Sequence, residues 1–295
     1  MIESARFTNV NGMYVDFNTD VIPFSSFTTE VDVRFTEKPK SQQHGIYAGN
    51  TFLGRRLFHC EGDIFASNSA EYIQRRMDMV AALIPRPQFG QQIVGVLEIL
   101  FSGMNETLRV ECTIDGYPEI PLDGASPARS RYQVNFKAYD PRLYGALQSM
   151  DIPFDPNWQN IGGRTYNKVY NKTYSLSSGT SGDTIIINSG NIETYPLVTI
   201  YGPATEPEAL MIRSDGVVFR FRLTGLVLAS VAESVFIDMR QHTVIRNDGT
   251  NAYQYAVGSD WWSLEPEFSN VVKFSASVLA QPAHMSIQWR NAYMF

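Results

Sequence analysis

Residues 131–142 constrain the architecture of this chain more than any other stretch. Val134, Phe136 and Ala138 alternate with polar residues, which predicts a strand with one buried face. Asp140-Pro141 then ends the strand, because proline has no N–H to donate to a neighbouring strand. The patterns before this stretch include strands and a helix, whereas those after it are strands alone. The stretch therefore closes one half of the chain and opens another.

The length of 295 residues suffices for two domains, each with a core of its own. We expect an N-terminal domain over residues 1–145 and a C-terminal domain over residues 146–295. A content of 44% hydrophobic, 13% aromatic and 18% charged residues is that of a folded protein and favours sheet over helix. The expected fold class is mainly β.

In the first half, Asn11-Gly12 predicts a tight turn between two short strands. Residues 131–138 form one of several segments that alternate as strands do. The others are residues 6–10, 13–17, 28–35, 55–65, 95–101 and 106–114. Val31, Val33 and Phe35 are expected on one face of their strand.

One helix is predicted from Ser69 to about Leu83. Asn68 can cap its N-terminus, with Glu71 completing a capping box. Four apolar residues recur at helical spacing before two prolines end the pattern: Ile73, Met77, Val80 and Ile84. With the strands, this helix predicts an α+β domain, a barrel or sandwich with a helix packed across it.

The pattern of the second half predicts an antiparallel, jelly-roll-like sandwich. We expect residues 151–163 to form a linker or irregular edge, residues 164–174 to be extended rather than helical, and residues 247–250 to form a hairpin tip. Eight strand-like segments follow at short intervals, at residues 183–187, 197–201, 209–213, 217–223, 234–238, 243–245, 271–275 and 285–289.

The formal charge of -6 is shared equally, with -3 in residues 1–150 and -3 in residues 151–295. No basic run is longer than Arg55-Arg56 or Arg75-Arg76, so tight nucleic-acid binding is not expected. Neither a signal peptide nor a membrane-spanning segment is recognisable, and we expect a protein made in a cytoplasm without membrane insertion.

The two cysteines, Cys60 and Cys112, are too few for a disulfide framework and are expected to be buried thiols. The four histidines form no metal-spaced pair, and no P-loop, dinucleotide fingerprint or Gly-x-Ser-x-Gly elbow occurs. Carboxylates such as Glu206 and Glu265 lie beside prolines in loops, where solvation is a better explanation than glycoside hydrolysis. We expect no enzymatic activity, no metal and no cofactor.

The pair Trp261-Trp262 has two possible interpretations. Two tryptophans in a loop of a sandwich can stack on sugar rings, with Asp260 beside them as a polar contact. Alternatively, one indole belongs to the core and the other to an interface, because adjacent residues of a strand point to opposite faces.

An ordered set of motifs resembles the distal tail protein (Dit) family of long-tailed phages, also called phage tail component or minor tail protein. Individually each motif is loose, but together they cover nearly the whole chain. They are Gln43-His-Gly45, residues 56–66, the helix through residues 75–83, residues 136–144, Tyr201-Gly-Pro-Ala-Thr-Glu-Pro207 and residues 258–274.

The resemblance implies a split-barrel N-terminal domain with one helix that assembles into a homohexameric ring, and a galectin-like C-terminal β-sandwich. Such a ring would join the tail tube to the tip or baseplate hub of the virion and carry receptor-binding proteins, with DNA passing through it only in transit during ejection. An acidic ring would repel DNA phosphates. The alternative is a carbohydrate-binding adhesin that contacts host-surface glycans.

Candidate contact residues follow from these two hypotheses. Five charged residues are candidates for contacts between subunits through Arg–carboxylate pairs, although a solvated charged face explains them equally well: Arg55, Arg56, Arg75, Arg76 and Asp78. The candidates for a glycan or partner contact are Asp260, Trp261 and Trp262.

Overall fold

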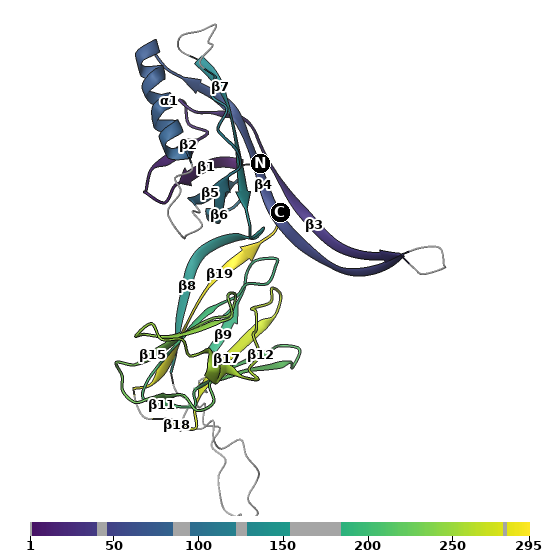
Figure 1. Cartoon of the computed structure of the whole chain (residues 1–295), viewed down its shortest axis with the longest axis vertical. Coiled ribbons are helices and arrows are strands. Elements are labelled where there is room, and N and C mark those ends of the chain that lie inside the picture. Colours follow the sequence, from purple (N-terminus) through teal and green to yellow (C-terminus); the bar gives the residue numbers. More distant parts are fainter. Residues whose placement is uncertain (1, 40–45, 85–94, 122–128, 154–183, 280–281) are drawn as a thin grey trace, which may run out of the picture. The chain divides into compact units, whose positions relative to one another are not determined.

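The structure is a computed structural model that describes residues 2–39, 46–84, 95–121, 129–153, 184–279 and 282–295 (Figure 1). It is mainly β, as expected from the sequence. The chain divides into two compact units, which we call unit 1 (Met1–Ala146 with Met294–Phe295) and unit 2 (Leu147–Tyr293). The last two residues thus belong with the N-terminal part of the chain.

Unit 1 is built from antiparallel strands and the helix α1. Its elements are β1 (Ile2–Thr8), β2 (Tyr14–Phe17), β3 (Phe24–Pro39), β4 (Ile46–Phe65), α1 (Ser69–Leu83), β5 (Gly95–Phe101), β6 (Leu108–Ile114), β7 (Arg129–Ala138) and the start of β8 (Leu143–Pro153). One row of strands runs β2-β1-β5-β6 and another runs β3-β4-β7, and β7 also pairs with the end of β6.

The predicted turn at Asn11-Gly12 is present between β1 and β2. Gly12 has a φ of +78°, in the region that favours glycine, and its N–H donates to the carbonyl of Asn9 at 3.0 Å. The amide of Asn9 donates to the carbonyl of Met13 at 2.8 Å. Two expectations were incomplete, because β4 begins nine residues earlier than residue 55, at Ile46, and because residues 143–153 form a strand that the sequence pattern did not indicate.

Strand β7 supplies the buried face that the sequence predicts. Val134, Phe136 and Ala138 are all buried, and the ring of Phe136 lies 5.1 Å from that of Phe7 and 6.1 Å from that of Phe17, between centroids. These aromatic pairs join β7 to the β1–β2 hairpin across the interior. The strand ends at Ala138, directly before Tyr139-Asp140-Pro141, as expected.

Helix α1 has the predicted bounds and the predicted cap. The side-chain oxygen of Asn68 accepts the amide of Glu71 at 2.9 Å, and the carboxylate of Glu71 accepts the amide of Ser67 at 2.7 Å. The apolar period that predicts the helix does not mark its buried face, however. The buried residues are Tyr72, Met79, Ala82 and Leu83, whereas Ile73, Met77 and Ile84 are exposed.

Unit 2 contains three antiparallel sheets within its described residues, with strand orders β16-β15-β10-β19-β8, β13-β12-β17-β9 and β14-β11-β18, and β8 contributes its part beyond Ala146. The strands are β9 (Thr184–Ile187), β10 (Leu197–Tyr201), β11 (Ala204–Thr205), β12 (Glu208–Arg213), β13 (Val218–Arg222), β14 (Val227–Leu228), β15 (Ser234–Asp238), β16 (Thr243–Arg246), β17 (Ser269–Ser275), β18 (Val278–Leu279) and β19 (His284–Tyr293), with a 3₁₀ turn at Tyr253–Ala256.

All eight strand segments predicted for unit 2 are strands, and their inward side chains share one core that includes Trp262, Phe221, Phe274 and Trp289. A turn at residues 247–250 is also present, closed by the amide of Arg246 donating to the carbonyl of Thr250. Residues 164–174, expected to be extended, lie outside the described residues, as does the predicted linker beyond Pro153.

Both thiols should be unreactive in the folded chain. Cys60 and Cys112 are free and buried, and burial raises the pKa of Cys60 to about 12 and that of Cys112 further. Because the thiolate is the nucleophile, neither should react with a chromogenic disulfide reagent near pH 8 until the chain unfolds in denaturant, when both react. Stoichiometric labelling of the native protein would contradict this packing.

Candidate assembly surfaces

Strands β3 and β4 form a hairpin that extends away from the rest of unit 1 (Figure 1). Near its base the hairpin is covered on one face, where Phe58 and Cys60 of β4 are fully buried. Beyond a bulge at Gly54 it continues as the segment that we call the arm, residues 33–39 of β3 and 46–53 of β4. The long, paired strands therefore place the arm outside the body of unit 1.

One face of the arm continues the buried face of the hairpin. Val31 lies opposite Arg56, and two residues further Val33 lies opposite Leu53, so the extra residue of the bulge is in β4 and the alternation of β3 is kept. Val31 is half-buried, whereas Val33 and Phe35 are 51% and 63% exposed. Val33, Phe35 and Leu53 thus form an apolar surface, the arm face, which unit 1 leaves uncovered.

Two interactions hold the base of the arm. The guanidinium of Arg55 donates to the carboxylate of Asp32 across the strands at 2.7 Å, and both groups are partly exposed. A Cβ at Gly54 would lie 2.9 Å from the Cβ of Asp32, so glycine allows the close approach at the bulge. Arg55, a predicted contact residue, is therefore paired inside its own chain at the point where the arm begins.

Arg56 is fully buried. Its guanidinium lies 2.7 Å from the sulfur of Met294 and 3.5 Å from both the carbonyl oxygen of Phe295 and the hydroxyl of Thr29. Burial lowers the pKa of Arg56 to about 10, so the side chain remains charged at neutral pH. This predicted contact residue thus links β4 to the last two residues of the chain.

The three predicted residues of α1 also have partners in their own chain. Arg75 donates to Glu71 and to the carbonyl of Phe65, while the Nε of Arg76 donates to the carbonyl of Ile120 at 3.1 Å. Asp78 accepts from Gln74 at 2.9 Å. The two arginines point to different neighbours, as adjacent helical residues must, and both fasten the helix to unit 1.

Alongside these charges, α1 presents a surface that we call the helix stripe: Ile73, Met77, Val80 and Ile84. Ile73 and Met77 are each 51% exposed, Ile84 is 37% exposed, and Val80 is half-buried. The stripe is distinct from the side of the helix that packs against unit 1. The helix therefore has a second apolar face that the fold of unit 1 does not use.

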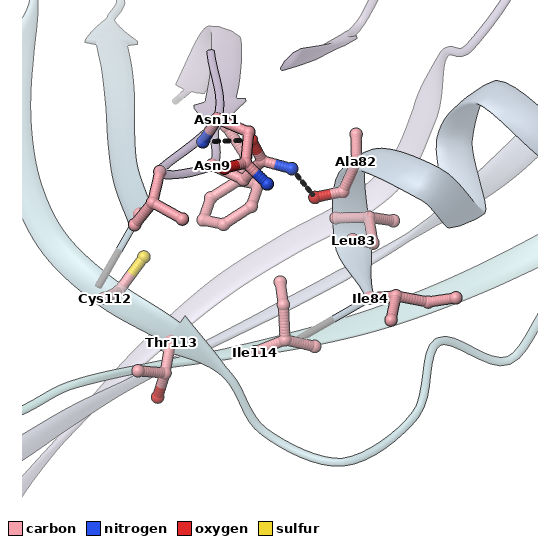
Figure 2. A pocket seen from close by; sticks show the side chains of 11 residues that line it. Asn9, Asn11, Ala82, Leu83, Ile84, Cys112, Thr113 and Ile114 are labelled. Atoms are coloured by element: carbon pink, nitrogen blue, oxygen red, sulfur yellow. Dashed lines mark hydrogen bonds between the residues drawn. The ribbon is translucent and has the colours of Figure 1, made fainter. Parts of the chain in front are cut away.

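The stripe ends beside a small pocket of about 80 Å³ between the end of α1, the β1–β2 turn and β6 (Figure 2). Leu83, Ile84 and Cys112 are among its lining residues. Ligand pockets for small molecules usually enclose about 300–1,000 Å³, so this one is too small for such a ligand. Asn9 and Ala82 also line the pocket, and the side-chain amide of Asn9 donates a hydrogen bond to the carbonyl of Ala82 at 3.1 Å.

The outer face of the β2-β1-β5-β6 row carries charges of alternating sign. Asp16, Arg6, Glu98 and Arg109 occupy neighbouring positions in register across four strands, beside an open polar hollow of about 330 Å³. Arg6 donates two hydrogen bonds to Asp16, and this bonding raises the pKa of Arg6. The row is electrically balanced, so it is not a basic patch of the kind that binds nucleic acid.

The three residues proposed for glycan binding are used in packing within unit 2. Trp262 is buried in the core, and Asp260 accepts a backbone N–H of β13 at 2.9 Å. The indole of Trp261 stacks on His242 at 4.5 Å and lies nearly parallel to Tyr253 at 6.1 Å, between centroids. The structure thus brings Trp261 and Asp260 to the surface of unit 2 but separates Trp262 from them.

Within the part of the chain that the structure describes, no group of three or more His, Cys, Asp or Glu side chains is arranged to hold a metal ion. Nor does any helix there have the length and hydropathy that crossing a membrane requires.

Sequence reasoning did not find the arm face, although a signal for it exists. Thr51-Phe52-Leu53 directly precedes the predicted strand at residue 55, with Gly54 alone between them. An isolated glycine in a strand pattern indicates a bulge rather than a turn, so the strand could have been extended backward. The sequence pattern does not indicate, however, that Val33 and Phe35 are exposed.

No family model and no curated protein matches this chain by sequence. Among solved structures, it is similar to the Dit protein (gp 19.1) of SPP1, described as a paradigm of the hub adsorption apparatus in phages that infect Gram-positive bacteria. The two share 14% identity over 98% of this chain and 99% of that one, with a TM-score of 0.63. A chain of the phage p2 baseplate in its activated conformation with Sr has 11% identity, 98% coverage of both chains and a TM-score of 0.50.

These likenesses establish the fold over nearly the whole chain. The resemblance to the distal tail protein family, suggested by the order of the sequence motifs, is confirmed at the level of the fold.

Asn9 should stabilise the junction between the β1–β2 turn and α1. Its side chain accepts the amides of Asn11 and Met13 and donates to the carbonyl of Ala82, which lies at the helix end where carbonyls lack helical partners (Figure 2). Asn9→Ala is expected to lower the free energy of unfolding by about 1–2 kcal/mol in chemical denaturation.

Asn11→Ala is the matched control for this measurement. Asn11 contributes its backbone N–H to the same network, so this change in the turn should cost less than about 0.5 kcal/mol. Equal losses from the two substitutions would contradict the role assigned to the Asn9 side chain.

Proposed function

We propose that this chain is a structural protein of a phage tail tip, in which six copies of unit 1 form a closed ring. The ring joins the tail tube to the tip or baseplate hub, and unit 2, a galectin-like sandwich, carries receptor-binding proteins. The protein is made in the host cytoplasm and ends up in the virion. The proposal is supported by the fold shared with SPP1 Dit, and the number six follows the family that the sequence resembles.

The observation that carries the proposal is the uncovered arm face. An isolated two-stranded hairpin is marginally stable in water, and exposed apolar patches on folded proteins commonly mark interaction sites. Val33, Phe35 and Leu53 form such a patch on a segment that leaves the body of unit 1. Such a segment suits a subunit of an assembly, in which a neighbouring chain covers the apolar patch.

The charged candidates fit this role in different ways. Arg55 lies at the base of the arm, next to the arm face. Arg75, Arg76 and Asp78 lie on α1, next to the helix stripe. Both surfaces are exposed and could contact a neighbouring copy. Arg56 is fully buried and supports the hairpin from within unit 1. Exposed pairs such as Arg55–Asp32 contribute little affinity and serve mainly to orient the contact.

DNA is a passing cargo in this proposal and not a ligand. The chain has a net charge of -6, and the charged row across β2, β1, β5 and β6 is balanced in sign. A ring of this composition has no strong attraction for phosphates, which suits a passage through which DNA must move without stopping.

The mass of the purified protein in solution tests the proposal directly. Light scattering on a size-exclusion column should give about six times 33.2 kDa. Because apolar contacts are not screened by salt, the mass should persist when the Debye length falls from about 10 Å to about 3 Å, at 0.1 M and 1 M salt respectively.

A mass of 33.2 kDa at every concentration would contradict ring assembly through unit 1. Saturable binding to a glycan array that Trp261→Ala abolishes would instead support the adhesin alternative.

A further inference from the structure

The arm face and the helix stripe are two apolar surfaces that cannot cover each other within one chain. Helix α1 follows the Phe65 end of β4, whereas Leu53 lies 12 residues back along the same strand. At about 3.3 Å per residue, that separation is about 40 Å. Figure 1 shows α1 and the arm on opposite sides of unit 1.

We propose that the arm face of one copy packs on the helix stripe of a second copy. This inference rests on the ring assembly proposed above and assigns the two surfaces that meet in it. The occupant of the stripe is Val33, Phe35 and Leu53 of the neighbouring chain. The stripe residues Ile73, Met77, Val80 and Ile84 are spaced by four, three and four, the pattern with which a helix packs along a single seam.

The arm is long enough to lie along the stripe. From Ile73 to Ile84 the helix rises about 17 Å, at 1.5 Å per residue. From residue 33 to residue 39 the arm strand of β3 extends about 20 Å, at 3.3 Å per residue. The arm can therefore follow the whole stripe, and its apolar residues Val33 and Phe35, about 7 Å apart along the strand, contact part of it.

The two surfaces also match in charge. In the described part of the hairpin around the arm face, Glu30 and Asp32 balance Arg34 and the exposed Arg55. On α1 the acidic and basic residues are likewise equal in number: Glu71, Asp78, Arg75 and Arg76. Each copy has a net charge of -6, yet these two surfaces are locally neutral. Two copies can therefore approach here without the repulsion that the rest of the chain imposes.

The contact joins two different surfaces, so it is heterologous. Each copy offers one arm face and one helix stripe, and a chain of such contacts either closes into a ring or continues as a filament. A closed ring leaves neither surface uncovered on any copy. The same geometry explains why α1 has a second apolar face that its own unit does not bury.

Cysteine cross-linking between copies tests the pairing. One chain carries Phe35→Cys and a second carries Met77→Cys, both at exposed positions, and the mixture is treated with a short bis-maleimide. The native Cys60 and Cys112 are buried, so the wild-type chain serves as the unreactive background. The mixture should give a covalent dimer in a yield at least about tenfold above either chain alone, because contact raises the effective concentration to the millimolar range.

Val257→Cys provides the positional control, since Val257 is 80% exposed and lies in unit 2. Paired with Phe35→Cys, it should link no better than background. A cross-link formed by the Phe35→Cys chain alone would show an arm-to-arm contact and overturn the inference. A particle of hexameric mass without the arm-to-helix link would overturn it too, while leaving the proposed function standing, and a strict monomer would overturn both.

A matched pair of substitutions tests the choice of face. Phe52 is 57% exposed and lies opposite Arg34, so it points away from the arm face on the same segment. Phe35→Asp should raise the protein concentration needed for half-assembly by at least about tenfold, because it forces a charge into an apolar contact. Phe52→Asp should change it less than about threefold. Equal effects of the two variants would contradict the assigned face, and near-ultraviolet circular dichroism confirms that each variant is folded.

Discussion

The exposed apolar face of the β3–β4 hairpin is the feature of unit 1 on which its role in an assembly depends. A two-stranded ribbon with no core beneath it gains stability when a surface outside its own chain covers it. The β3–β4 hairpin is packed at its base, where Phe58 and Cys60 are buried. The same face continues into the arm as Val33, Phe35 and Leu53, where the described chain provides no cover. Burial of apolar area is the main favourable term in association as it is in folding. In the proposed assembly, a second copy covers the face of the arm that unit 1 leaves exposed.

The base of the arm is built to hold its direction. Gly54 permits the bulge, Arg55 and Asp32 tie the two strands together, and the buried Arg56 fastens β4 to Met294 and Phe295. Burying an arginine costs desolvation, and the contacts of Arg56 with Met294 and Phe295 hold this part of β4 in place. A surface held at a fixed angle is what a ring requires, since an error in each contact is repeated at every subunit.

Local signals in the sequence predicted what depends on local chemistry. The Asn68 cap and the prolines after Ile84 fixed the ends of α1, and alternation located the strands of unit 2. The apolar period predicted the helix but not its buried face, because Ile73 and Met77 satisfy a helical period as well as Tyr72 and Met79 do. Alternation likewise placed Val33 and Phe35 on one face of their strand. The same alternation occurs whether that face is covered by the core of its own chain or by a neighbouring chain, so the pattern could not distinguish the two. For Trp261 and Trp262 the sequence allowed either stacking on a sugar or packing within unit 2. That the two residues are adjacent did not decide between these alternatives.

Hydrogen exchange in the arm tests the central claim most directly. Strand amides are protected in proportion to the free energy needed to open them, and a hairpin exposed on both faces opens readily. The account predicts that peptides spanning residues 49–55 exchange slowly in the assembled protein and much faster in the same chain diluted to monomer, while peptides of β7 exchange alike in both states. Equal exchange of the arm in the two states would contradict the claim that a second copy covers it.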